Sequence, residues 1–370
     1  MTHDDPVTTT LTRGAEGLRF DADAELERLL RSRSRRVAVR RARTIAAALV
    51  VALLGVSVAW IARPGTGAGV TPAGTEPTGS IAYMQVRNAG QHVEVGVLSV
   101  GDGSTHPVPV GPFDAYPVWS PDGSRVALGS GPNYDETSLT IANADGSDAQ
   151  VLVDHQLKGT MSWSPDGTKI AYIRDDDQGY TALFVADVDG STDREILPGW
   201  WQSVSWNPDG SRLLICGHPE TTDHTYSEED YDIYTVTPGG SDLAPLLHEP
   251  GYEHFAAWSP DGTEILFARS PSYDDAAYRS DVFVIDADGS HERQLTSYDG
   301  FDSFPVWSPD GQWIAFGTDR DSTPEEQQAN RQDDAFANIS IDVMRADGSD
   351  LRPLITAAEG ETLLPGSWTW

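Results

Sequence analysis

The 370-residue sequence contains a single cysteine, Cys216, and this scarcity excludes several kinds of site. An intrachain disulfide needs two cysteines, and a cysteine-rich zinc site or an iron–sulfur cluster needs several. Cys216 ends an apolar run that begins after Arg212. A lone cysteine in such a strand-like run is expected to be a small, buried hydrophobic residue.

Motifs of common enzymes are also missing. The chain has no Gly-x-Ser-x-Gly turn, no His-Glu-x-x-His helix and no phosphate-binding loop. Its nine histidines are scattered and form no evident triad. A further group could offer metal ligands, but its spacing matches no known ligand pattern: His218, His224, Glu220, Asp223, Glu228, Glu229 and Asp230. We therefore predict no catalytic residues, no metal and no cofactor.

Positive charge is scarce after the first 63 residues. Residues 1–63 hold eleven Arg, no Lys and seven acidic residues, whereas the rest of the chain holds fourteen basic and fifty acidic residues. So acidic a segment has no excess of Lys or Arg to displace the counterions of nucleic-acid phosphates, and it repels anionic headgroups. We expect no nucleic-acid partner, and we expect the two segments to lie in different environments.

One uncharged run, residues 44–62, is long enough to cross a bilayer as a helix. Seven arginines lie within residues 31–43, and only Arg63 follows closely. The positive-inside rule then places the N-terminus in the cytoplasm and the rest of the chain outside. A cleaved signal peptide is the alternative, but its charged region would be 43 residues long, without a clear cleavage site. We predict a single-pass helix in the cell membrane.

The segments on either side of the apolar run differ in composition. Residues 1–43 are expected to form a cytoplasmic segment, partly disordered, with a short helix whose apolar stripe contains Leu26, Leu29 and Leu30. This helix either binds a cytoplasmic partner or only leads into the membrane. Residues 63–77 are rich in Gly, Pro and Thr, which predicts a flexible linker.

A repeat dominates the remaining residues, 78–370. The pentad Trp-Ser-Pro-Asp-Gly recurs, once with Asn for Ser, at intervals of 44, 43, 52 and 49 residues, beginning at Trp119, Trp163, Trp206, Trp258 and Trp307. An alternating apolar run follows each pentad, and a second turn of the Asp-Gly-Ser type comes later. Asp-Gly supplies the positive φ of tight hairpins, and the Trp is large enough to fill the wedge between blades. The pattern predicts four-stranded meanders, the blades of a β-propeller.

The two ends of the repeat region complement each other. Residues 77–83 match the part of the repeat that follows the pentad, but no Trp strand precedes them. The C-terminal residues 366–370 look like that missing strand. We therefore predict an all-β, six-bladed propeller, closed by pairing of the N- and C-terminal strands, which removes exposed sheet edges, and preceded by one transmembrane helix.

These pentads with their Asp-Gly-Ser turns resemble the WD40-like repeats of TolB-type propellers, over about residues 77–370. The resemblance implies the fold and says little about function, because such repeats occur in transport accessories, peptidase propeller domains and lyases. TolB itself is released into the periplasm by signal cleavage and has a separate N-terminal α/β domain. This chain shows neither feature, which weighs against a Tol–Pal role.

Candidate binding residues lie on the propeller face opposite the repeated turns, where the variable loops gather. One of the neighbours Trp200 and Trp201 has to point away from the core, because side chains alternate along a strand. We predict binding of an envelope protein, peptide or glycan; the alternatives are an extracytoplasmic enzyme of the propeller lyase or hydrolase kind, and a transmembrane signalling protein whose cytoplasmic helix binds a regulator. The candidate residues are Asp114, Trp200, Trp201, Tyr252, His254, Phe301 and Asp302.

Overall fold

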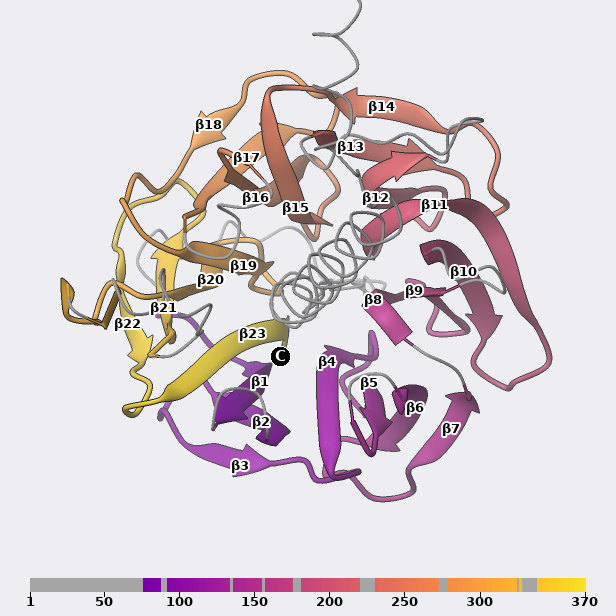
Figure 1. Ribbon diagram of the computed structural model, residues 1–370, viewed down its shortest axis with the longest axis horizontal. Coiled ribbons are helices and arrows are strands. Elements are labelled where there is room, and N and C mark those ends of the chain that lie inside the picture. The colour runs from indigo at the N-terminus through magenta and orange to yellow at the C-terminus, as the bar shows by residue number, and fades with distance from the viewer. Residues whose placement is uncertain are drawn as a thin grey trace, which may run out of the picture. The chain divides into compact units, whose positions relative to one another are not determined.

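The computed structural model describes residues 76–87, 92–133, 136–154, 157–175, 181–219, 230–272, 279–324, 326–327 and 338–370. The predicted cytoplasmic segment, the predicted membrane helix over 44–62 and nearly all of the predicted linker lie outside these residues. Within the described ranges, no helix has the length and apolar character needed to cross a membrane. The named elements of these ranges are all β-strands, which confirms the all-β prediction (Figure 1).

Three separate sheets have four antiparallel strands each. The first contains both ends of the repeat region, in the order β23-β1-β2-β3: β23 (Glu361–Thr369), β1 (Ser80–Arg87), β2 (His92–Ser99) and β3 (Thr105–Pro107). The second contains β4 (Phe113–Trp119), β5 (Arg125–Gly131), β6 (Ser138–Asn143) and β7 (Gln150–Val153). The third contains β19 (Asp302–Trp307), β20 (Trp313–Thr318), β21 (Ser340–Arg345) and β22 (Arg352–Ile355). As predicted, the last strand pairs with the first.

The other strands join into one longer sheet, in the order β18-β17-β16-β15-β13-β12-β11-β10-β9-β8, with β14 paired to β13. Strand β11 pairs with β10 through its first half and with β12 through its second half. Strands β13 and β15 meet in a short parallel pairing, Asp230 with Gly251 and Tyr231 with Tyr252. The bounds are β8 (Leu157–Trp163), β9 (Lys169–Asp175), β10 (Thr181–Asp187), β11 (Asp193–Trp206), β12 (Leu213–Pro219), β13 (Asp230–Val236), β14 (Ala244–Leu247), β15 (Gly251–Trp258), β16 (Glu264–Ser270), β17 (Asp281–Asp286) and β18 (Arg293–Gln294).

The repeated pentads form the tight turns that join strands such as β8 to β9. In the pentad of β8, the Asp166 carboxylate accepts hydrogen bonds from the Ser164 hydroxyl and from the Thr168 amide, at 2.7 and 3.0 Å. The glycine of the next pentad, Gly210, has a φ of +75° and packs against the ring of Pro165. The repeated chemistry of the turn therefore also influences how neighbouring meanders pack.

The repeat Trp residues fill the space between meanders, as the sequence predicts. Trp163, Trp307 and Trp368 are at most 1% exposed. The backbone amides of Trp119 and Trp206 each donate a 2.9 Å hydrogen bond to a serine of the preceding meander, Ser367 and Ser162 respectively. Cys216 is also buried, in agreement with its expected role as a small hydrophobic residue.

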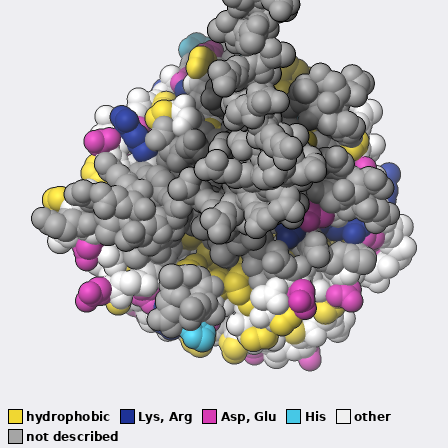
Figure 2. All heavy atoms as spheres, viewed as in Figure 1, with side chains coloured by type: hydrophobic (Ala, Val, Ile, Leu, Met, Phe, Trp, Pro, Cys, Tyr) yellow, Lys and Arg dark blue, Asp and Glu magenta, His cyan; other side chains and the backbone are white. Residues whose placement is uncertain are grey.

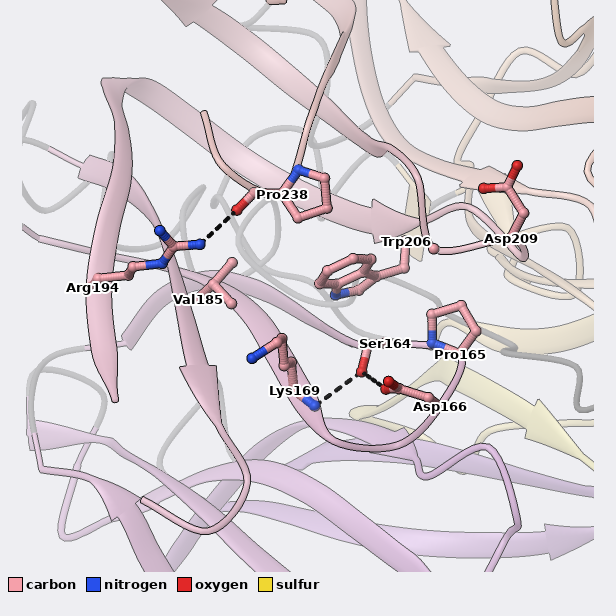
Figure 3. Close-up of a pocket in the computed structure, with 10 residues that line it drawn as sticks. Ser164, Pro165, Asp166, Lys169, Val185, Arg194, Trp206, Asp209 and Pro238 are labelled. Atoms are coloured by element: carbon pink, nitrogen blue, oxygen red, sulfur yellow. Dashed lines mark hydrogen bonds between the residues drawn. The ribbon is translucent and has the colours of Figure 1, made fainter. Parts of the chain in front are cut away.

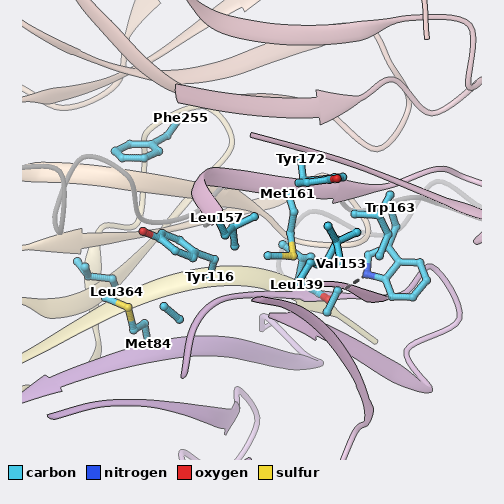
Figure 4. Packing of buried hydrophobic residues seen from close by; sticks show 14 of the residues in the cluster. Met84, Tyr116, Leu139, Val153, Leu157, Met161, Trp163, Tyr172, Phe255 and Leu364 are labelled. Atoms are coloured by element: carbon cyan, nitrogen blue, oxygen red, sulfur yellow. Dashed lines mark hydrogen bonds between the residues drawn. The ribbon is translucent and has the colours of Figure 1, made fainter. Parts of the chain in front are cut away.

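The first strands of several meanders share a bulge three residues before the repeat Trp. Tyr116, Phe255 and Phe304 have φ values of 59°, 55° and 55°, a left-handed conformation that is uncommon for bulky residues. The bulges turn these rings into a buried apolar cluster that also contains Met84 and Leu364 (Figure 4). Aromatic side chains thus meet where the innermost strands converge.

Candidate functional site

Four aromatic rings lie side by side across four strands. The register pairs Trp200 of β11 with His218 of β12, whose ring centroids are 6.3 Å apart. His218 meets Tyr231 of β13 edge to face at 5.5 Å. Tyr231 in turn pairs with Tyr252 of β15, with ring centroids 4.6 Å apart. Because cross-strand neighbours on one sheet face stand close together, the strand pairing alone brings these rings into a line.

The line of rings continues toward the innermost strands. Tyr252 lies 5.3 Å from His254, and His254 lies 4.9 Å from Phe255. Phe255 contacts Phe304 of the next meander at 4.2 Å, and Phe304 contacts Phe301 at 5.8 Å. We call these eight rings, from Trp200 to Phe301, the aromatic row. It contains four of the seven residues predicted from sequence.

The two ends of the aromatic row differ in exposure. Trp200, His218 and Tyr231 are half-buried, whereas Tyr252 and Phe301 are at most 2% exposed. The half-buried end, formed by Trp200, His218 and Tyr231, is called here the outer end of the row, and the buried rings pack against it. Half-exposed aromatic faces suit sugar rings, proline and cationic groups, which stack on π surfaces.

Trp201 has a different environment from its neighbour. Its side chain is 2% exposed and meets the ring of Tyr234 edge to face at 5.7 Å. It belongs to a core cluster that also contains Val204 and Ile215. Trp201 therefore packs between strands, and its place in a binding site stays a prediction.

Asp302, beside Phe301, is buried and engaged within the chain. Its carboxylate forms an ion pair with Arg320 and accepts a 2.7 Å hydrogen bond from the Thr318 hydroxyl. Burial raises the pKa of Asp302, against the opposing effect of Arg320. The guanidinium of Arg320 lies 4.6 Å from the ring centroid of Tyr298. Asp302 thus links β19 to the end of β20 and to the residues that follow it.

Asp114 belongs to strand β4 and does not join the aromatic row. It is 2% exposed, and one carboxylate oxygen accepts hydrogen bonds from the amides of Val110 and Gly111, at 2.9 Å each. The carboxylate therefore closes the loop that precedes β4. The sequence predicted Asp114 as a binding residue on the face of the variable loops, whereas the structure buries it. Its part in ligand binding stays a prediction.

A buried carboxyl group lies beside His254. Glu253 is 0% exposed and accepts a 2.6 Å hydrogen bond from Arg269, while its other oxygen is buried without a hydrogen-bond partner. Burial raises the pKa of Glu253 to about 7, and the charge of Asp232 adds to this, although Arg269 opposes both. Arg269 also binds Glu292 through two hydrogen bonds of 2.8 Å.

His254 and Ser303 form a contact that resembles part of a hydrolase site. The imidazole Nε2 lies 3.1 Å from the serine Oγ, but Nδ1 is buried and has no hydrogen-bond partner among the described residues. Burial also lowers the pKa of His254 to about 3, which makes the ring a weak base. Within the described part of the chain, the pair lacks the third group that orients a catalytic histidine. It does not provide an activated nucleophile.

The described residues contain no group of three His, Cys, Asp or Glu side chains able to hold a metal ion. His224, one of the two histidines considered as a ligand from sequence, lies outside these residues. On the face shown in Figure 2, acidic side chains lie around the periphery of the described surface. This charge suits a cationic partner better than an anionic one.

Sequence reasoning missed two members of the aromatic row as binding residues. His218 was considered as a metal ligand only, and Tyr231 was not singled out. The available signal was the aromatic residue at each of these positions, next to an apolar strand. Linking them to Trp200 requires the register of β11 with β12 and the parallel contact between β13 and β15, which local sequence does not encode.

No protein-family model and no curated protein matches the sequence. The structure is similar to TolB from Acinetobacter baumannii, with a TM-score of 0.62 and 19% identity over 80% of this chain and 67% of that chain. It is also similar to the putative TolB from Agrobacterium tumefaciens, with a TM-score of 0.54 and 20% identity over 79% of this chain and 99% of that chain. Kuenenia stuttgartiensis hydrazine synthase gives a TM-score of 0.57 at 12% identity, over 78% and 47% of the two chains. These likenesses show a TolB-like β-propeller fold.

Proposed function

We propose that the chain is a membrane-anchored β-propeller that binds an envelope protein, peptide or glycan outside the cytoplasm, at the outer end of the aromatic row. The observation that carries this proposal is the half-buried set Trp200, His218 and Tyr231, held from behind by buried rings. Rigid aromatic side chains give a large contact area at a small cost in conformational entropy. The fifty acidic against fourteen basic residues after residue 63 favour partners with cationic groups.

The arrangement of the whole chain belongs to the same proposal. Six blades are supported by the recurrence of four-stranded meanders and by the pairing of β1 with β23. The proposed segments are a cytoplasmic stretch over 1–43, a membrane helix over 44–62, a linker over 63–77 and the propeller over 78–370. The arginines before the apolar run support the proposed orientation.

Photo-crosslinking in intact cells tests the binding role. A photoreactive amino acid replaces Trp200 in the full chain, and a control chain carries it in place of Val151, which is 59% exposed on β7. We expect a defined protein adduct at position 200 and none at 151. A glycan partner is tested by binding to envelope polysaccharides, with Trp200→Ala as the control. The proposal is contradicted if position 200 forms no protein adduct and Trp200→Ala leaves glycan binding unchanged.

Membrane anchoring has a separate test. After alkaline extraction of membranes, the full chain is expected in the pellet, and a chain lacking residues 44–62 is expected in the supernatant. Protease added to the outside of spheroplasts is expected to digest the propeller and leave an N-terminal tag intact. Release of the full chain by alkali, or digestion of the tag, contradicts the proposed topology.

A further inference from the structure

A cavity of about 340 Å³ lies between two neighbouring meanders, among the repeated turns (Figure 3). Lys169 and Val185 line it from one meander, and Trp206 and Asp209 from the next. Trp206 follows Trp200 by six residues on β11, or about 20 Å along an extended strand. Trp200 is in the middle of β11, six residues from both Arg194 and Trp206, which line the cavity from the two ends of the strand. The cavity is therefore separate from the exposed end of the aromatic row, and it is independent of the proposed function.

A difference between repeats leaves room beside Trp206. In the preceding pair of meanders, the Arg125 guanidinium lies 5.1 Å from the ring centroid of Trp163. Lys169 occupies the position of Arg125 in its own repeat, six residues after the repeat Trp. Its ammonium group forms an ion pair with Asp187 of the same meander. The shorter side chain, drawn toward Asp187, leaves the space that Arg125 fills in the other interface.

The indole of Trp206 also keeps an unused hydrogen-bond donor. The equivalent Nε1 of Trp163 donates to the Val118 carbonyl at 3.1 Å. Trp206 is 6% exposed, and its Nε1, like those of the repeat residues Trp119, Trp258 and Trp307, is buried without a hydrogen-bond partner among the described residues. This donor is therefore closed off from the cavity, and Trp206 offers a ligand the apolar surface of its ring.

The charged groups of the cavity are separated by sign. Figure 3 shows Arg194 and the Lys169 ammonium on one side of the Trp206 indole, and Asp166 and Asp209 on the other. Arg194 is exposed and donates a 3.3 Å hydrogen bond to the carbonyl of Pro238, which leaves other N–H groups of its guanidinium to face the cavity.

Both acids remain ionised because their own turns stabilise the carboxylates. Hydrogen bonds from Ser164 and Thr168 lower the pKa of Asp166, and those from Ser211 lower the pKa of Asp209. In each case a single carboxylate oxygen, Oδ1, accepts these bonds. The second oxygen is therefore available to a cationic group in the cavity.

We propose that this cavity binds a small zwitterion with the chemistry of a free amino acid or dipeptide. Arg194 holds its carboxylate, and Asp166 and Asp209 face its ammonium group. The apolar body of the ligand packs against Val185 and the indole ring. The cavity volume is at the lower end of the range for small-molecule sites, which suits a ligand of this size.

Calorimetric titration of the full chain in detergent micelles tests the charge pattern. The probes are the dipeptide alanyl-leucine, its N-acetyl form and its C-terminal amide. We expect the dipeptide to bind at millimolar concentration or below, and each blocked form to bind at least about tenfold more weakly, because each loses one charge-assisted contact.

Substitutions assign the two charges to their partners. Arg194→Gln is expected to abolish the difference between the dipeptide and its amide, while Asp209→Asn is expected to reduce the difference between the dipeptide and its N-acetyl form. Arg125→Gln is the matched control, because it removes the same charge from the preceding interface. Circular dichroism establishes that each variant is folded.

Three results overturn the proposal. One is the absence of dipeptide binding to the folded chain at millimolar concentration. Another is equal binding of the dipeptide and both blocked forms. The third is an equal loss of affinity in the Arg194→Gln and Arg125→Gln variants, since binding would then not depend on this cavity. None of these results bears on the aromatic row, so failure here leaves the proposed function standing.

Discussion

Trp200 and Trp201 are neighbours in sequence and lie on opposite sides of strand β11. Trp200 is half-buried beside His218, with ring centroids 6.3 Å apart, whereas Trp201 is 2% exposed and meets Tyr234 edge to face at 5.7 Å. Alternation along the strand requires this opposition. One residue of the pair is thus placed to contact a ligand, and the other to support the fold.

Substituting each Trp separately distinguishes these two roles. Trp201→Ala is expected to lower the free energy of unfolding by about 3–5 kcal/mol, because a large buried side chain leaves a cavity. Trp200→Ala is expected to cost only about 1 kcal/mol, while abolishing partner binding. Urea unfolding of the full chain measures the first effect, and photo-crosslinking from a second site, at His218, measures the second. Equal costs of unfolding for the two variants contradict the assignment.

The raised pKa of Glu253 predicts that the free energy of unfolding falls as the pH rises. Burial raises its pKa in the folded chain from 4.5 to about 7, so the folded state binds the proton more tightly than the unfolded state. Its contribution to stability is therefore complete below pH 4.5 and is lost between pH 4.5 and about 7. Glu253→Gln, which stays neutral, is expected to lack this loss. The difference in unfolding free energy between wild type and variant, measured across this range, checks the sign.

The lowered pKa of His254 predicts the opposite pH dependence, a free energy of unfolding that falls as the pH falls. Burial lowers its pKa from 6.5 to about 3, so the unfolded state binds the proton more tightly. The contribution of His254 to the stability of the folded chain is present above pH 6.5 and is lost as the pH falls toward 3. Nitrogen-detected NMR of the histidine rings is expected to show a neutral His254 at pH 5. A protonated ring at that pH contradicts the burial of this side chain.

If the propeller is closed by its two chain ends, substitutions at two equivalent serines should lower the free energy of unfolding equally. The Ser367 hydroxyl, on the strand that pairs the two chain ends, accepts a 2.9 Å hydrogen bond from the Trp119 amide. The Ser162 hydroxyl, on β8, accepts a hydrogen bond of the same length from the Trp206 amide. Ser367→Ala and Ser162→Ala are each expected to cost about 1–3 kcal/mol, because each leaves a buried amide without an acceptor. Thermal unfolding measures both. A much smaller cost for Ser367→Ala would indicate that the junction opens before the rest unfolds.

Substitutions at two glycines test the cost of steric contact and the cost of backbone strain separately. A Cβ at Gly159 would lie 2.4 Å from the Gln202 carbonyl oxygen, so Gly159→Ala is expected to cost about 1–3 kcal/mol through displacement of the backbone. Gly190 has a φ of +75° and open space around it, so Gly190→Ala is expected to cost about 1 kcal/mol through strain alone. Gly190→Asn should recover part of that cost, because Asn tolerates this conformation. Chemical unfolding of the three variants tests the order.

The binding residues show where prediction from sequence ended. Asp114 and Asp302 are polar residues near variable loops, and the sequence alone predicted them as binding residues on that face. The structure pairs Asp302 with Arg320 and gives Asp114 two loop amides. These partners are 18 residues away in one case and three or four in the other, with nothing in the local pattern to connect them. Burial of a charge depends on such partners, which only the folded chain assembles.

The sequence by itself determined the strands, the turns and the pairing of the two chain ends. Asp-Gly turns, alternating apolar runs and repeat Trp residues act over a few positions, so their effect can be read locally. Tertiary structure decided which aromatic rings meet and where a cavity remains. The aromatic row depends on strand register and on a parallel contact between β13 and β15. The cavity depends on the replacement of Arg125 by Lys169 in an equivalent position, whose consequence appears only when two meanders pack together.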